Sequence, residues 1–305
     1  MKLIVITGIT ATGKTDLSIE LAKKLNGEIV SADSMMVYKY MDIGTAKPSL
    51  EERQGIEHYL IDVVEPSESF SVKDFLKKAD ESIKKIYSKG KTPIIVGGTW
   101  LYIQALLYGL ADAPETDWDL REKLYKEDSY KLYRKLLEVD KDYAEKIHPN
   151  DKKRIVRALE VYITTGKPFS SFLKEHSFRK SRYSFTGFVL NRPKEEIMER
   201  IEKRVERMFE KGLVEEVKKL IEMGFENAIT SMQAIGYKEL IPYIKGEISI
   251  EEAKEKIIKN TKSFAKRQIR SFRSKFKEKN KWEWLNVSNY TKEEVLDKII
   301  KKYEK

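Results

Sequence analysis

The sequence predicts an α/β fold, a parallel β-sheet flanked by helices. Short apolar runs alternate with segments of helical periodicity through the first third of the chain, a pattern typical of parallel sheets covered on both faces. A glycine-rich turn directly follows the first apolar run, at the end of a strand where such sheets bind their ligands. A long charged stretch without strand patterns then precedes one further apolar run.

Hydrophobic periodicity predicts the elements in order. Strands are expected at residues 2–7, 28–32, 58–64, 92–98 and 184–191. Helices are expected at residues 16–25, 72–90, 193–212, 213–224 and 253–281. A Pro- and Asp-rich segment at 111–119 interrupts the early alternation. We therefore expect one core made of residues 1–112 and 183–305, interrupted by a helical insertion domain at 113–182.

Composition narrows the functional classes. The chain of 305 residues has no Cys and three His, which excludes disulfides, thiol catalysis and cysteine-ligated zinc and argues against a histidine metal site. No apolar run has the length of a membrane span, and the first residues enter a strand without a signal-peptide pattern. We expect a cytoplasmic, monomeric enzyme that contacts no membrane.

The positive charge is concentrated in one segment. The formal net charge is +10, and residues 253–281 hold twelve Lys or Arg against two Glu. An apolar row at helical spacing comprises Ile258, Ala265, Ile269, Phe272 and Phe276, and a cationic row comprises Lys259, Lys262, Lys266, Arg270, Arg273 and Lys277. Such a helix docks by one side and presents its cationic ridge either to a phosphate backbone or to solvent alone.

Residues 8–15, GITATGKT, form a phosphate-binding loop between the first strand and the first helix. The glycines let consecutive backbone N–H groups surround phosphate oxygens, and the helix N-terminus adds its dipole. Lys14 is placed to neutralise the outer phosphate, and the Thr15 hydroxyl to hold Mg²⁺. The sheet is therefore expected to be of the P-loop NTPase-like kind, and the ligand to carry a di- or triphosphate.

Two more loops lie at the carboxyl ends of strands. Asp33 follows the second strand, where its carboxylate either accepts a proton or holds Mg²⁺ through water, or else caps a turn. Gly97 and Gly98 permit close backbone approach, and Thr99 adds a hydroxyl. ATP hydrolases of the motor or GTPase kind usually carry an acid at the end of a second apolar strand. Here the 92–98 strand ends in glycines, and Asp62 is only a weak candidate for that acid. This favours a transfer enzyme over a molecular switch. These residues leave open a transferase, a small-molecule or nucleoside kinase, and a non-catalytic RNA-binding adaptor.

Longer motifs are more specific than the phosphate loop. They are GITATGKT (8–15), SADSMMVYKYMDIGTAKP (31–48), HYLIDVVEPSESFSV (58–72), PIIVGGTWLYIQAL (93–106), IHPNDKKRIVRALEVY (147–162), NRPKEEIMERIEKRVERMFEKGLVEEV (191–217), QAIGYKEL (233–240) and TKSFAKRQIRSF (261–272). Together and in this order they span nearly the whole chain. With these motifs the sequence closely resembles the tRNA dimethylallyltransferase family, the bacterial enzymes of tRNA prenylation.

This resemblance implies a reaction and its partners. A dimethylallyl group would pass from dimethylallyl diphosphate to N6 of the adenosine at position 37, just 3′ of the anticodon, in tRNAs that read codons beginning with U. The cofactor would be Mg²⁺, and the macromolecular partner the anticodon stem-loop of tRNA. The insertion domain at 113–182 and the helices after residue 191 would contact that RNA.

The resemblance also implies residue roles. Asp33 would take the proton from N6, while Lys14, Thr99 and Arg121 would act at the reaction channel, the last balancing charge on the leaving diphosphate. Thr15 would hold the metal ion. Diphosphate-binding residues would be Gly8, Ile9, Thr10, Ala11, Thr12, Gly13, Lys14 and Thr15. tRNA-binding residues would be Asp33, Ser34, Met35, Met36, Thr99, Arg121, Arg157, Ala158, Leu159, Glu160, Val161, Gln233, Lys238, Lys266, Arg267, Gln268 and Ile269.

Three positions depart from the family pattern. Ile9 stands where Pro is usual, Met36 where Gln is frequent, and Tyr40 where Gly is frequent. Met36 lacks the polar group that Gln would offer to tRNA.

Four apolar residues are candidates to line an isoprenoid pocket: Met35, Met36, Trp100 and Tyr102. We expect at least half of them to fill the core instead.

Overall fold

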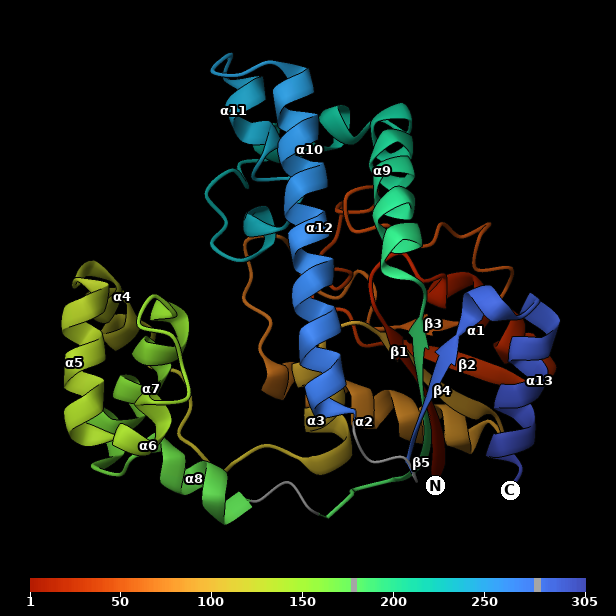
Figure 1. Ribbon diagram of the computed structural model, residues 1–305, viewed down its shortest axis with the longest axis horizontal. Helices are drawn as coiled ribbons and strands as arrows, with labels where there is room; N and C mark the ends of the chain where they lie inside the picture. The colour runs from red at the N-terminus through yellow and green to blue at the C-terminus, as the bar shows by residue number, and fades with distance from the viewer. Residues whose placement is uncertain (177–179, 277–280) are drawn as a thin grey trace. The chain divides into compact units, whose positions relative to one another are not determined.

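The computed structural model describes residues 1–176, 180–276 and 281–305 (Figure 1). Lys277 of the predicted cationic row lies outside these residues. By internal contacts the chain divides into two units. The first is made of Met1–Leu107 and Tyr183–Lys305, and the second of Tyr108–Arg182.

Unit 1 is built on a six-stranded parallel sheet, which confirms the predicted α/β fold. The strands are β1 (Lys2–Gly8), β2 (Gly27–Ser31), β3 (His58–Tyr59), β4 (Thr92–Gly97), β5 (Ser184–Asn191) and β6 (Trp282–Asn286). Their spatial order is β3-β2-β4-β1-β5-β6, so β1 lies between β4 and β5 and ends at the centre of the sheet. The phosphate loop that follows β1 therefore lies at the middle of the carboxyl edge, where open parallel sheets bind ligands.

Two strand predictions are wrong. The expectation of helices alone after residue 191 misses β6, which pairs with β5 in the register Gly187↔Trp282. The strand expected at 58–64 is limited to His58 and Tyr59. Leu60 and Asp62 adopt φ of 66° and 57°, and a left-handed backbone leaves the extended conformation that a strand needs.

Helices cover both faces of the sheet. The helices α1 (Lys14–Lys24) and α13 (Lys292–Tyr303) share one apolar core with β1, in which Ile4 and Ile6 are fully buried. Leu3 and Val5 are equally buried and alternate to the other face. On the side of β2 and β4, α2 (Val72–Ser88) packs against the sheet, and its Phe75 stacks on Tyr102 of α3 (Trp100–Tyr108) at 4.1 Å between ring centroids.

The C-terminal helices support the loop that follows β2. They are α9 (Lys194–Glu210), α10 (Leu213–Glu222), a 3₁₀ turn (Ser231–Gln233), α11 (Leu240–Ile244) and α12 (Ile250–Lys275), and α9 and α12 stand side by side (Figure 1). Buried Tyr38 and Met41 of the loop share a core with Tyr237 and with Ile257 of α12. The loop carrying Asp33 is therefore fixed by residues distant in sequence.

Unit 2 consists of helices only within its described residues. They are α4 (Trp118–Lys126), α5 (Ser129–Val139), α6 (Lys141–Ala144), α7 (Lys152–Thr165) and α8 (Phe169–His176). The first four begin after an Asp whose carboxylate accepts a backbone N–H of the first turn, and these caps are Asp117, Asp128, Asp140 and Asp151. Such caps satisfy backbone donors that the helix itself leaves unpaired. No described helix of either unit combines the length and apolarity of a membrane span.

Tyr40 is strained, and its replacement by Gly is expected to stabilise the protein. Its φ is 63° and its side chain is exposed, so glycine relieves backbone strain of about 1 kcal/mol and loses little packing. We expect Tyr40→Gly to raise the free energy of unfolding by about 0.5–1 kcal/mol in urea titration. As a control, Tyr290→Gly removes an equally exposed Tyr at φ −138° and is expected to lower it. A Tyr40→Gly protein no more stable than the parent contradicts the strain.

Candidate active site

The phosphate loop presents an uncapped helix N-terminus. Ala11 and Gly13 have φ of 64° and 92°, and α1 begins at Lys14 with no side chain capping its first turn. The first N–H groups of a helix have no partner within it and carry its positive dipole end. The loop after β1 is therefore an anion site of the kind that binds phosphate groups.

Lys14 spans this loop. Its ammonium group donates to the carbonyl oxygens of Gly8 and Ile9, each at 2.9 Å. Burial and, to a lesser degree, the positive charge of Arg204 lower the pKa of Lys14, the carboxylate of Asp33 opposes them, and together they bring this pKa to about 8. A cation held in such an environment gains strongly from an approaching anion.

Asp33 and Lys14 line the same cavity, which Thr15, Ser31, Met36 and His58 also line. One oxygen of Asp33 accepts the backbone N–H of Met35 at 2.8 Å, so the residue does make the turn bond that its position allowed. The other oxygen accepts no hydrogen bond from any described residue. One carboxylate can thus hold the turn and still face a ligand.

Gly97 and Thr99 join the ends of β4 and β2. A Cβ on Gly97 would lie 2.1 Å from the carbonyl oxygen of Ala32, which confirms that glycine is needed for close backbone approach. The hydroxyl of Thr99 accepts the N–H of Ser34 at 3.1 Å, and the backbone N–H of Thr99 donates to the carbonyl oxygen of Ala32. Thr99 therefore holds the Asp33 loop directly.

The remainder of that loop is held by the half-buried Glu216 and the buried Lys47. The carboxylate of Glu216 on α10 accepts the N–H groups of Asp42, Ile43 and Gly44 and the hydroxyl of Tyr237. Lys47 is buried and pairs with Asp42 at 2.6 Å and with Asp62 at 2.5 Å. Asp62, the weak candidate for an acid at a strand end, is thus engaged by Lys47 in a structural ion pair.

Arg200 of α9 and Arg192, just before this helix, reach the phosphate loop, and neither was predicted from the sequence. Arg200 donates to the carbonyl of Ala11 at 2.7 Å, and Arg192, just before α9, donates to that of Thr12 at 3.2 Å. Burial lowers the pKa of Arg204, and Asp33 partly offsets this. The available signal was the spacing of Arg200, Arg204 and Arg207, which places them on one face of a helix.

Unit 2 encloses most of the segment from Arg157 to Val161. Ala158, Leu159, Glu160 and Val161 are at most 3% exposed, so their side chains have almost no surface to offer RNA, contrary to the sequence expectation. Glu160 instead accepts from Arg121 at 3.0 Å and from Arg157 at 2.7 Å. Glu160 thus orients two arginines, Arg121 of α4 and Arg157 of α7, whose side chains are partly exposed.

The other predicted RNA contacts lie at different depths. Gln233, Lys238, Lys266 and Arg267 are exposed, Ser34, Met35, Met36 and Ile269 are half-buried, and Gln268 is buried. Of the four candidate isoprenoid-lining residues only Met36 lines the cavity with Lys14. Tyr102 packs in the core and Trp100 meets Phe276 edge-on at 4.7 Å.

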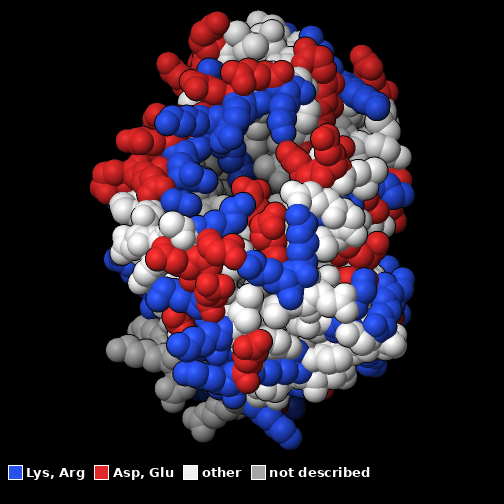
Figure 2. Space-filling model, turned by 90° about the vertical axis from the view of Figure 1, so that its right-hand side faces the viewer, with Lys and Arg blue, Asp and Glu red and all other residues white. Residues whose placement is uncertain are grey.

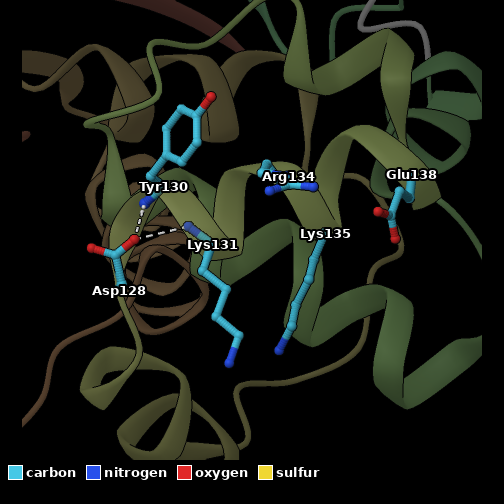
Figure 3. A pocket seen from close by; sticks show the side chains of 6 residues that line it. All are labelled: Asp128, Tyr130, Lys131, Arg134, Lys135 and Glu138. Atoms are coloured by element: carbon cyan, nitrogen blue, oxygen red, sulfur yellow. Dashed lines mark hydrogen bonds between the residues drawn. The ribbon is translucent and has the colours of Figure 1, made fainter.

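The surface carries both charges. Viewed from the side on which α9 and α13 lie, Lys and Arg gather beside a hollow in the upper half, with acidic groups among them (Figure 2). A second depression lies on α5 of unit 2, where Lys131, Arg134 and Lys135 lie between Asp128 at one end and Glu138 at the other (Figure 3). Asp128 there caps α5 through the N–H groups of Tyr130 and Lys131.

Comparison with known sequences gives one consistent result. The sequence profile of the family described as IPP transferase matches residues 36–275. A protein named tRNA dimethylallyltransferase from a Sulfurihydrogenibium species is 63% identical over 301 residues, which cover 99% of this chain and 97% of that protein. One of the same name from Aquifex aeolicus is 54% identical over 307 residues, with 99% and 98% covered.

Solved structures agree. A tRNA delta(2)-isopentenylpyrophosphate transferase from Staphylococcus epidermidis is 47% identical, covers 99% of both chains and superposes with a TM-score of 0.72. A eukaryotic dimethylallyltransferase, described as acting on tRNA, superposes with a TM-score of 0.81 at 34% identity, covering 94% of this chain and 74% of that one.

Proposed function

The chain belongs to the IPP transferase family, that of the tRNA dimethylallyltransferases, and we propose that it transfers the dimethylallyl group of dimethylallyl diphosphate to N6 of adenosine 37 in tRNAs that read codons beginning with U. The observation that carries this is the shared cavity of Lys14 and Asp33. This cavity supports a diphosphate site beside a carboxylate that has one oxygen available.

Transfer breaks the bond between the allylic carbon and the bridging oxygen, whose electrons leave with the diphosphate. Negative charge builds on that oxygen, so the N-terminus of α1, Lys14 and Arg204 stabilise the transition state more than the ground state. The N6 amine attacks the allylic carbon, and Asp33 takes the proton it loses. The target base lies in a single-stranded loop and leaves its stack at modest cost.

The site fits Mg²⁺ bound mainly through the diphosphate. The Thr15 hydroxyl and the Asp33 carboxylate are hard oxygen donors that line one cavity, and no cluster of three or more His, Cys, Asp or Glu suited to a metal occurs among the described residues. Mg²⁺ usually keeps several waters and binds through one or two protein oxygens plus phosphates. When bound, it would neutralise the leaving diphosphate, with Thr15 as its ligand.

Label transfer tests the function. Incubation of the protein with unmodified tRNA, Mg²⁺ and labelled dimethylallyl diphosphate is expected to place label on N6 of adenosine 37, located by nuclease digestion. Consumption of ATP with a small acceptor would instead indicate a kinase. Retained tRNA binding without either reaction would indicate an adaptor. The cytoplasmic location and the monomeric state remain predictions. Sedimentation of the purified protein tests the second of them.

The cationic helix α12 is expected to bind the tRNA backbone. Lys259, Lys266, Arg270 and Arg273 are exposed, whereas Lys262 pairs with Glu202. Ala265, Phe272 and Phe276 of the predicted apolar row are buried, and Ile258 and Ile269 are half-buried. The helix thus docks by one side and leaves most of its cations accessible, as a surface that follows phosphates requires.

Neutralising this ridge should weaken tRNA binding in a salt-dependent way. We expect the double variant Lys266→Gln, Arg267→Gln to flatten the plot of log affinity against log salt by about two units, one per lost phosphate contact. The control Lys292→Gln, Lys301→Gln removes two exposed cations of α13 and should leave the slope unchanged. Filter binding across a salt series measures both, and equal slopes in all three proteins would mean that the ridge is only solvated.

A further inference from the structure

One buried side chain connects the cationic helix to two catalytic loops. Gln268 of α12 is 8% exposed. Its Oε1 accepts the backbone N–H of Thr10 at 2.9 Å, and its Nε2 lies 3.5 Å from the carbonyl oxygen of Gly98. A Cβ on Gly98 would lie 3.1 Å from the same Nε2, so the amide is enclosed between the loops.

Apolar contacts reinforce this connection. Ile9 and Ala11 of the phosphate loop pack in one cluster with Ala265 and Ile269 of α12. At the end of α12, the ring of Phe276 lies 4.7 Å from that of Trp100, the residue after Thr99. The helix therefore contacts both loops along its last three turns.

The same helix presents its cations elsewhere. Lys266 is exposed and precedes Gln268 by two positions, which corresponds to roughly 200° around a helix. An RNA bound to the exposed side would therefore contact the opposite face of the element that holds the loops. Gln268 itself is directed toward the protein.

We propose that Gln268 is a positioning residue that sets the shape of the phosphate loop from α12. By accepting the Thr10 N–H it fixes the second residue after β1, and with it the direction of the N–H groups that surround the diphosphate. Loss of that bond would leave a half-buried donor unpaired, and the loop would relax away from the geometry that binds phosphate. This inference rests on the proposed function for the identity of the ligand.

The proposal also links the two substrates. If tRNA restricts α12, the restriction reaches the diphosphate loop through Gln268, and the two ligands then alter each other's affinity by the same factor. In the intact protein, the affinity for Mg²⁺–pyrophosphate should differ with and without saturating tRNA. Without the Gln268 bond that difference should disappear.

Gln268→Met tests the role, because it keeps the length and packing of the side chain and removes its hydrogen bonds. We expect Mg²⁺–pyrophosphate to bind roughly tenfold more weakly in calorimetry without tRNA, while tRNA affinity stays within about twofold of the parent. kcat should fall with KM for tRNA unchanged. The matched control is Gln104→Met, on α3, whose amide makes no hydrogen bond to a described residue; both affinities should stay within about twofold.

Amide hydrogen exchange separates positioning from general destabilisation. Exchange at Thr10 should accelerate in Gln268→Met, and Gln268→Glu should restore protection because a carboxylate still accepts the N–H. Unchanged pyrophosphate affinity with tRNA affinity lowered tenfold would place Gln268 on the RNA surface and overturn the proposal. So would equal Thr10 exchange in the Met and Glu variants. Neither readout needs prenyl transfer, so failure of the proposed function appears separately, in the label-transfer assay.

Discussion

Asp33→Asn should abolish prenyl transfer while tRNA affinity stays within a fewfold of the parent. General-base catalysis contributes roughly 10²–10⁴-fold, and the amine of adenine is a poor nucleophile until it loses its proton. We therefore expect the rate constant of transfer to fall by about 10³-fold in single-turnover label transfer. Asp33→Ala should behave likewise in transfer.

The asparagine variant distinguishes the base from the turn. The oxygen of Asp33 that accepts the Met35 N–H at 2.8 Å has a counterpart in the Asn amide, so the loop keeps its bond and only the basic oxygen is lost. Asp16→Asn is the charge-matched control, because Asp16 is exposed in the first turn of α1. It should keep activity within about threefold. An Asp33→Asn enzyme of parental activity would remove Asp33 as the base.

Local patterns predicted the parts of the site that are contiguous in sequence. The phosphate loop, Asp33 and Gly97 each follow an apolar run directly, and the parallel arrangement of β1, β2 and β4 places their ends together. Glycine at 97 was predictable for the same reason, since adjacent strand ends approach closely. The sequence alone could not show that Asp33 also makes a turn bond.

Distant pairings were not predictable in this way. β6 is short, and Trp282 packs where a Cβ on Gly187 would come within 2.4 Å of its ring. That fit exists only once β5 and β6 lie side by side. Arg204 and Gln268 look like surface positions of charged helices until α9 and α12 are docked on the phosphate loop. Likewise, residues 158–161 match a segment that was expected to contact tRNA, but in the folded unit 2 they are buried.

Lys14→Met should lower transfer by about 10²–10³-fold, the usual effect of removing one group that stabilises developing charge. Unlike Asp33→Asn, it should also weaken binding of Mg²⁺–pyrophosphate, since the lost cation contacts the leaving group in both ground and transition states. The two variants therefore separate the two roles: Asp33→Asn loses the proton acceptor, and Lys14→Met loses the cation of the anion site. Parental pyrophosphate affinity in Lys14→Met would place the diphosphate elsewhere.

The lowered pKa of Lys14 predicts a pH dependence of that binding. The free protein holds the ammonium proton below pH of about 8, and bound diphosphate favours the protonated form. Affinity should therefore be complete below pH 8 and fall up to roughly tenfold per unit above it. Lys14→Arg stays protonated throughout and should show only the titration of pyrophosphate itself, so the ratio of the two affinities isolates Lys14. A ratio independent of pH between 7 and 9.5 would mean that the buried ammonium does not contact the diphosphate.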